Sequence, residues 1–183
     1  MNTAQYQTAT PESIWAILQE TNETLTRTSI LQVENQIAIK ELQKTVGGIT
    51  NSYGKFAEEY FFNSFERGEQ NFFGKKFDEI GRNLKLFWQG LTDEYDIVLY
   101  NKDAVAIIEI KFKADENDIP QVLKKAETFK ILSPNYKDFK IYLGLASMSF
   151  SKALEEKCIE NGIAIIKQVG DKVIISDKHL KVF

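Results

Sequence analysis

The chain has 183 residues, 43% of them hydrophobic and 27% charged, which is an ordinary globular composition with enough length for one sizeable core and an appendage. The net charge of −3 excludes a global basic field, so nucleic-acid binding would need a local group of basic side chains. Cys158 is the only cysteine, no apolar run approaches a membrane span, and nothing near Met1 resembles a signal peptide. We therefore expect a cytoplasmic protein with no intrachain disulfide and no membrane association.

A long helix is predicted for the N-terminal 50 residues. Thr10-Pro11-Glu12 combines an N-cap residue, a proline at the first helical position and an acid in the first turn, and no helix breaker follows until Gly47-Gly48. The seam of this helix has heptad spacing but is polar in its middle, which is typical of a weak coiled coil. It consists of Ile14, Leu18, Thr21, Leu25, Thr28, Gln32, Asn35, Ile39, Leu42 and Val46.

We expect residues 1–50 to form a coiled-coil arm that makes a homo-oligomer or docks a partner, and residues 51–183 to form the main domain. Two shorter helices folded back on that domain are the alternative.

A second helix is predicted from about Ser52 to Arg67. Glu58 shares its face with Phe61, Phe62 and Phe65, so its carboxylate is pushed toward the core. A half-buried carboxylate needs a partner. A metal ion is one candidate, and a backbone amide or a lysine is an equal alternative.

A strand at 84–88 and a hairpin are predicted next. The hairpin strands are 96–100 and 105–112, joined by a tight turn at 101–104. In this register the numbers of cross-strand partners add up to 205, so Asp96 lies opposite Glu109 with the Cβ atoms roughly 5 Å apart.

Glu109 and Lys111 point to the same face at the end of a strand that is otherwise apolar. Charges in such a place are costly unless something binds them, and Asp96 and Glu109 repel each other unless a cation lies between them. Mg²⁺ suits this arrangement, because it prefers oxygen ligands and often uses one or two carboxylates together with water. Lys111 would then stand near the waters of that ion.

The remaining elements alternate between helix and strand, which predicts parallel strands joined by right-handed crossovers. The expected fold class is therefore α/β, with a mixed sheet flanked by helices and preceded by the long N-terminal helix. The expected elements are a helix at 118–132, a strand at 139–146, a helix at 149–161, and strands at 163–167 and 172–176.

Polar side chains around the start of the 118–132 helix are candidates for contacts with nucleic-acid phosphates. They are Lys113, Gln121, Lys124 and Lys125, with Lys130 further along the helix. The alternative is a solvated helix face whose lysines pair with Glu127.

The motifs also carry a family resemblance. Gly54-Lys55-Phe56-Ala57-Glu58 on a helix, then Glu94-Tyr95-Asp96-Ile97-Val98-Leu99, then Ile107-Ile108-Glu109-Ile110-Lys111 resemble the PD-(D/E)XK nuclease superfamily over residues from about 50 to 183. The closing strands resemble those of uncharacterised bacterial members that carry an N-terminal coiled coil. Tyr95 stands where the family name has proline, which is a departure from the pattern.

The resemblance implies a restriction-endonuclease-like fold and hydrolysis of phosphodiester bonds, with DNA as the expected substrate and Mg²⁺ or Mn²⁺ as the cofactor. It implies that Asp96, Glu109 and the carbonyl of Ile110 bind the metal, that Lys111 positions or activates the attacking water, and that Glu58 completes the site. The alternative is a catalytically inactive nuclease-like scaffold that serves oligomerisation or protein interaction.

Overall fold

The computed structural model describes residues 10–67, 71–170 and 172–183. The chain divides into two compact units, Met1–Thr50 and Asn51–Phe183. Among the residues described, no helix has the length and apolar character needed to cross a membrane.

Helix α1 runs without interruption from Pro11 to Arg67. Its start is the predicted one, because the Thr10 hydroxyl accepts a hydrogen bond from the Ser13 amide at 3.3 Å. The predicted helix end at Gly47-Gly48 is wrong. Each glycine costs only about 1 kcal/mol relative to alanine inside a helix, and no proline follows to remove a backbone donor. The expected second helix at 52–67 is therefore the last part of α1.

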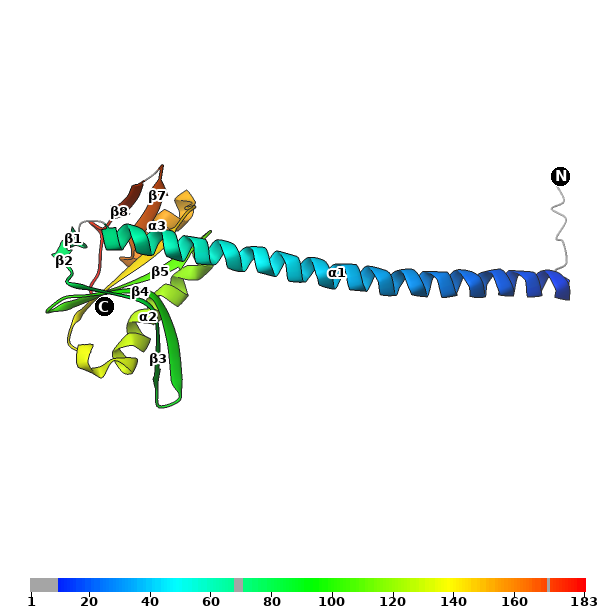
Figure 1. Cartoon of the computed structure of the whole chain (residues 1–183), viewed down its shortest axis with the longest axis horizontal. Coiled ribbons are helices and arrows are strands. Elements are labelled where there is room, and N and C mark those ends of the chain that lie inside the picture. The colour runs from blue at the N-terminus through cyan, green and yellow to red at the C-terminus, as the bar shows by residue number, and fades with distance from the viewer. Residues whose placement is uncertain (1–9, 68–70, 171) are drawn as a thin grey trace, which may run out of the picture. The chain divides into compact units, whose positions relative to one another are not determined.

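The domain formed by residues 51–183 contains a mixed six-stranded sheet in the order β3-β4-β5-β6-β7-β8 (Figure 1). Its strands are β3 (Glu79–Trp88), β4 (Leu91–Tyr100), β5 (Ala104–Lys111), β6 (Lys140–Ser147), β7 (Ala164–Val169) and β8 (Lys172–Ser176). Strands β3 to β5 form an antiparallel meander, β5 to β7 are parallel, and β8 is antiparallel to β7. A separate two-stranded sheet pairs β1 (Asn71–Phe72) with β2 (Lys75–Lys76).

Two helices make the crossovers between the parallel strands: α2 (Ile119–Leu132) and α3 (Lys152–Asn161). Short 3₁₀ turns, η1 (Glu116–Asp118) and η2 (Pro134–Tyr136), flank α2. The predicted α/β class, with a mixed sheet flanked by helices and a long N-terminal helix, is confirmed.

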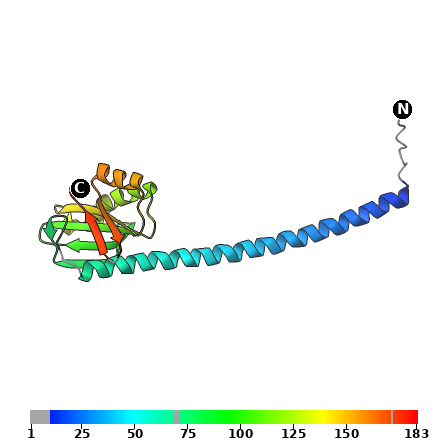
Figure 2. The same cartoon turned by 90° about the horizontal axis from the view of Figure 1, so that it is seen from above.

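Apolar side chains fill both faces of the sheet. The α1-side cluster joins Ala57, Phe61 and Phe65 of α1 to Ile97, Leu99, Ile108 and Ile110 of the sheet. The α2-side cluster joins the buried faces of α2 and α3 to the other face, which includes Tyr95, Val98, Val105 and Ile107. Figure 2 shows the end of α1 and helix α3 on opposite sides of the sheet.

The β4–β5 register is the predicted one, with pairs from Ile97–Ile108 to Tyr100–Val105. The Asn101 side chain fixes the turn, because its Oδ1 accepts from the Asp103 and Ala104 amides at 3.0 and 2.7 Å. Pairing stops just before Asp96, where β4 bends.

The bend is visible in the side-chain directions of β4. Tyr95 and Val98 lie three residues apart, yet both belong to the α2-side cluster, so the alternation of faces is broken between them. On the neighbouring strand, Asn83 has a positive φ of 49°. It lies between the pairs Arg82–Ile97 and Leu84–Tyr95, which places it beside Asp96. The two strands therefore bend together, and the ends of β4 and β5 separate at Asp96.

Candidate active site

The candidate site lies where β5 ends and β4 bends. Glu109 occupies the last buried position of the α2-side face of β5 and is only 5% exposed. Asp96 is half-buried at the bend, and Glu58 is half-buried on α1. A helix and two neighbouring strands thus contribute the three acids singled out from the sequence.

Asp96 is anchored to the neighbouring strand through its side chain. Its Oδ2 accepts a hydrogen bond from the Ile110 amide at 2.7 Å, at the point where the β4–β5 pairing has already ended. The carboxylate replaces a main-chain carbonyl as the acceptor, so it is drawn toward the end of β5.

The charge environment of Asp96 includes the other three predicted residues. Burial and the charges of Glu109 and Glu58 raise the pKa of Asp96 to about 7, although the Ile110 amide and the Lys111 ammonium act in the opposite direction. The three acids and the lysine are therefore close enough to interact electrostatically. Bringing these like charges together in a half-buried place disfavours the ionised form of Asp96.

Glu109 is surrounded by nitrogen atoms from two elements. Its Oε1 lies 3.0 Å from the Lys111 Nζ and 3.3 Å from the Gln121 Nε2, and its Oε2 lies 3.6 Å from the Lys125 Nζ. Burial would lower the pKa of Lys111, but Glu109 and Asp96 outweigh it and hold that pKa above its ordinary value. Lys111 is therefore a positively charged donor at neutral pH.

Lys125 is buried, which its sequence context does not indicate. It is only 6% exposed, and its ammonium contacts the Asp93 carboxylate at 2.8 Å and the Glu94 carbonyl. The ammonium also lies 5.3 Å from the centre of the Tyr95 ring. Its buried ion pairs turn Lys125 inward, so it does not belong to an exposed row of phosphate-binding lysines.

Asp93 and Thr128 complete this network and were missed in the sequence. The Thr128 hydroxyl donates to the Asp93 Oδ2 at 2.6 Å, and the Tyr95 hydroxyl donates to Thr128 at 3.0 Å. Burial would raise the pKa of Asp93, but hydrogen bonds from Lys125 and Thr128 hold it below its ordinary value. One signal was available, since Gln121, Lys125 and Thr128 follow 4–3 spacing on a single face of α2.

The other predicted contacts with nucleic acid are on the surface. Lys113 follows β5, and Gln121 and Lys124 lie on α2; all three are exposed. Lys130 is half-buried. Gln121 alone among the exposed ones also reaches Glu109, so it connects the surface to the buried carboxylate.

The donor atoms at the site define what cation it suits. In the part of the chain that the structure describes, no group of three or more Asp, Glu, His or Cys side chains is arranged to hold a metal ion. The two carboxylates that interact here are those of Asp96 and Glu109. Two carboxylates with water would suit Mg²⁺ or Mn²⁺, and a cation would relieve the repulsion that, together with burial, raises the pKa of Asp96.

No protein-family model and no curated protein matches the sequence. Solved structures that match over 61% of this chain include Can2 from Sulfobacillus thermosulfidooxidans in complex with cyclic tetra-adenylate (18% identity, TM-score 0.45) and a repair endonuclease from Pyrococcus abyssi (19%, 0.44). A third is R.BspD6I2, the small subunit of the heterodimeric restriction endonuclease R.BspD6I (13%, 0.40, also over 61%). The matches cover 31%, 46% and 62% of those chains, which is less than two thirds of each.

The raised pKa of Asp96 predicts a pH-dependent effect of Asp96→Asn. The unfolded carboxyl ionises near its ordinary value of 3.8, whereas the folded one ionises near 7. Wild-type stability should therefore fall between these values as pH rises, and then level off. Asn still accepts from Ile110 but carries no charge. Urea unfolding in EDTA should show equal stability near pH 4 and an Asn variant that is more stable by up to about 4 kcal/mol at pH 8. A gap that is constant with pH would contradict this.

The buried network predicts that Lys125→Met is strongly destabilising. The substitution keeps the apolar stem but leaves Asp93 and Glu109 without the ammonium, and breaking a buried pair in this way costs about 3–5 kcal/mol. The control is Lys124→Met on the exposed face of the same helix, where about 0.5 kcal/mol or less is expected. The measurement is urea unfolding of both variants at pH 7, and similar losses for the two would contradict the network.

Proposed function

We propose that residues 51–183 form a divalent-metal-dependent nuclease of the PD-(D/E)XK type, with a restriction-endonuclease-like fold, that hydrolyses phosphodiester bonds of DNA. The observation that carries this proposal is the electrostatic grouping of Glu58, Glu109 and Lys111 around Asp96. These are the four side chains that such a reaction needs, and they come from three separate elements.

In this proposal Asp96, Glu109 and the carbonyl of Ile110 hold Mg²⁺ or Mn²⁺. When bound, such an ion would lower the pKa of a nearby water and neutralise negative charge on the scissile phosphate. Lys111 remains protonated beside Glu109, so its ammonium can orient the attacking water and stabilise charge that develops on the phosphate oxygens. Glu58 adds a third negative charge that favours cation binding and orients water.

Substrate binding is assigned to the exposed polar side chains next to the site. Lys113 and Lys124 present ammonium groups to phosphate oxygens, and Gln121 contacts the strand nearest to Glu109. Lys125 has a different role from the one first expected. It is a positioning residue that ties Glu109 to Asp93 and so fixes α2 against the bend of β4.

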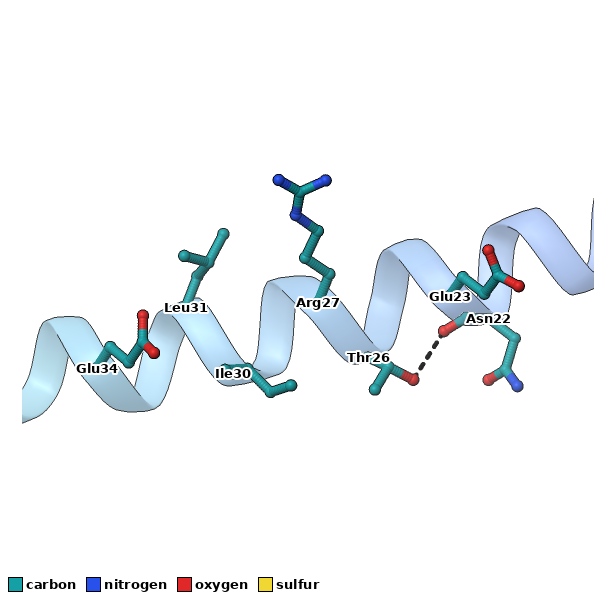
Figure 3. Close-up of a pocket in the computed structure, with 7 residues that line it drawn as sticks. All are labelled: Asn22, Glu23, Thr26, Arg27, Ile30, Leu31 and Glu34. Atoms are coloured by element: carbon teal, nitrogen blue, oxygen red, sulfur yellow. Dashed lines mark hydrogen bonds between the residues drawn. The ribbon is translucent and has the colours of Figure 1, made fainter.

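We also propose that residues 11–50 assemble copies of the chain into a homo-oligomer. All of these residues are exposed, including large apolar side chains such as Leu18, Leu25, Ile39 and Leu42. Figure 3 shows a shallow depression along this helix, and all seven side chains that line it come from the one helix. Its Ile30 and Leu31 project to different sides (Figure 3), so the apolar surface is broad and suits a partner helix more than a small ligand.

A catalytically inactive scaffold is the second candidate. One observation favours it: both oxygens of Glu109 already lie within 4 Å of a lysine nitrogen, so this carboxylate is neutralised without a metal ion. In that case the long helix would carry the function, and the acidic grouping would remain as a structural feature.

The nuclease proposal predicts cleavage that depends on the metal and on the site. Wild-type protein with Mg²⁺ or Mn²⁺ should cleave plasmid or single-stranded DNA, and EDTA should abolish cleavage. Glu109→Gln and Lys111→Met should each lower the rate by roughly 10²–10³-fold, because each removes charge stabilisation at the reacting phosphate. Glu127→Gln and Lys137→Met, at exposed positions, are the matched controls. Absent wild-type cleavage on every nucleic acid, or equal cleavage by the site variants, would overturn the proposal.

Thermal unfolding with Mn²⁺ then separates the two candidates in the same samples. A cation that binds only the folded state raises its stability by about 2.7 kcal/mol at a concentration of 100 Kd. A nuclease shows this rise in the wild type and loses it in Asp96→Asn. An inactive scaffold shows no rise in either.

The assembly proposal predicts that charge on the seam disrupts the oligomer. Leu25→Glu combined with Ile39→Glu should convert it to monomer in sedimentation velocity, because four or more glutamates would meet in an apolar interface. Gln19→Glu combined with Thr26→Glu adds the same charge away from the seam and should leave the sedimentation coefficient unchanged. A wild-type chain that is monomeric at micromolar concentration would refute the assembly.

A further inference from the structure

An exposed pair of aromatic rings borders the candidate site. Tyr53 of α1 stacks on Phe112, with ring centres 4.7 Å apart and planes inclined by 18°. The two residues are 51% and 38% exposed, so much of each ring meets solvent. The exposed ring surfaces are available for stacking by a planar ligand.

The fold explains why the pair lies at the site. Phe112 directly follows β5, and its stacking on Tyr53 places it on the side of Ile110, the face that α1 covers. Ala57, Phe61 and Phe65 of α1 are buried there, and Tyr53 is one turn beyond them at the open edge. Tyr53 also precedes Glu58 by five residues, or about 7.5 Å along the helix axis.

The immediate sequence around Phe112 is basic. Lys111 and Lys113 flank it, the first at Glu109 and the second exposed. Of the acids that follow, Asp115 accepts from the Asn117 amide at 2.7 Å and Asp118 accepts from the Asp115 amide at 2.9 Å, while Glu116 is exposed. Phe112 directly follows Lys111, which the proposed function places at the scissile phosphate, so a nucleotide held there would have its flat base next to the rings.

We propose that Tyr53 and Phe112 form a stacking platform for an unpaired base of the substrate, so that the nuclease acts on single-stranded or locally opened nucleic acid. The inference rests on the proposed function for its substrate. Bases inside a duplex are stacked on each other and cannot reach a ring, so the platform selects for strands whose bases are free. A second copy of the chain or an apolar peptide would not need the two lysines.

The test is a binding cycle carried out in EDTA, so that no strand is cut. Full-length protein is titrated into fluorescein-labelled oligothymidylate, into an abasic tetrahydrofuran oligomer of the same length, and into a closed duplex hairpin. Both single strands carry the same phosphates. Stacking of one base should make the abasic oligomer bind roughly 5- to 150-fold more weakly to the wild type. The duplex hairpin should also bind more weakly than oligothymidylate.

Substitutions of the two rings test whether they cause the difference in affinity between oligothymidylate and the abasic oligomer. Phe112→Leu and Tyr53→Leu should bring the thymidylate-to-abasic ratio close to one, and Phe112→Tyr should retain it. Phe87→Leu is the matched control, because Phe87 is 72% exposed on β3 but is not part of the pair. A gap that survives both leucine variants, or a wild type that binds the abasic oligomer or the duplex as tightly as thymidylate, would overturn the platform. A changed sedimentation coefficient in Phe112→Leu would instead assign the rings to a contact between copies.

The two proposals fail in different ways. A base-dependent gap without any cleavage in Mg²⁺ or Mn²⁺ removes the nuclease and leaves a single-strand-binding site. Metal-dependent cleavage with no base-dependent gap removes the platform and leaves the nuclease.

Discussion

The buried carboxylate of Glu109 is the constraint on which the arrangement of this domain depends. An ionised side chain in an apolar strand is tolerated only with charged or hydrogen-bonding partners around it. Here Lys111 comes from the same strand, while Gln121 and Lys125 come from α2. Lys125 also holds Asp93, which belongs to the part of the β3–β4 hairpin that extends past the paired segment of β5. Neutralising one carboxylate therefore fixes a helix and a hairpin at the end of the sheet.

The bend of β4 brings a second carboxylate, that of Asp96, to the buried Glu109, and the two acids together form the candidate site. If the β4–β5 pairing continued to this point, a main-chain carbonyl and not the Asp96 carboxylate would accept the hydrogen bond of the Ile110 amide. Instead its side chain accepts from Ile110, and the pKa of Asp96 rises to about 7 under the influence of burial, Glu109 and Glu58. Acids held this close destabilise the fold without a cation and favour one that binds. The two lysines beside Glu109 reduce that cost, and by the same contacts they would compete with a bound cation for Glu109.

The sequence predicts the parts of this site that local rules determine. The Asn101 turn sets the hairpin register, and an acid interrupting an apolar strand marks Glu109. The network of Asp93 and Thr128 could be predicted only in part: helical spacing places Thr128 on one face of α2 with Lys125, but the contact with Asp93 on β4 joins residues remote in sequence. The burial of Lys125 could not be predicted for the same reason, since burial of a lysine is decided by partners on another element. The helix end predicted at Gly47-Gly48 is wrong because the low helix propensity of glycine is a weak local preference, and the helix continues through both residues.

The charge of the whole chain limits how such a site can hold a polyanion. A protein with a net charge of −3 gains little from long-range attraction, and salt screens charges beyond about 8 Å at physiological ionic strength. In the proposed nuclease, binding would come from short-range contacts: a cation between Asp96 and Glu109, a few lysines, and base stacking. The proposed stacking on Tyr53 and Phe112 would not weaken with salt as phosphate contacts do. Under that proposal, aromatic contact with unpaired bases would replace the basic surface that other nucleic-acid-binding proteins use, and it would confine recognition to strands that are already open.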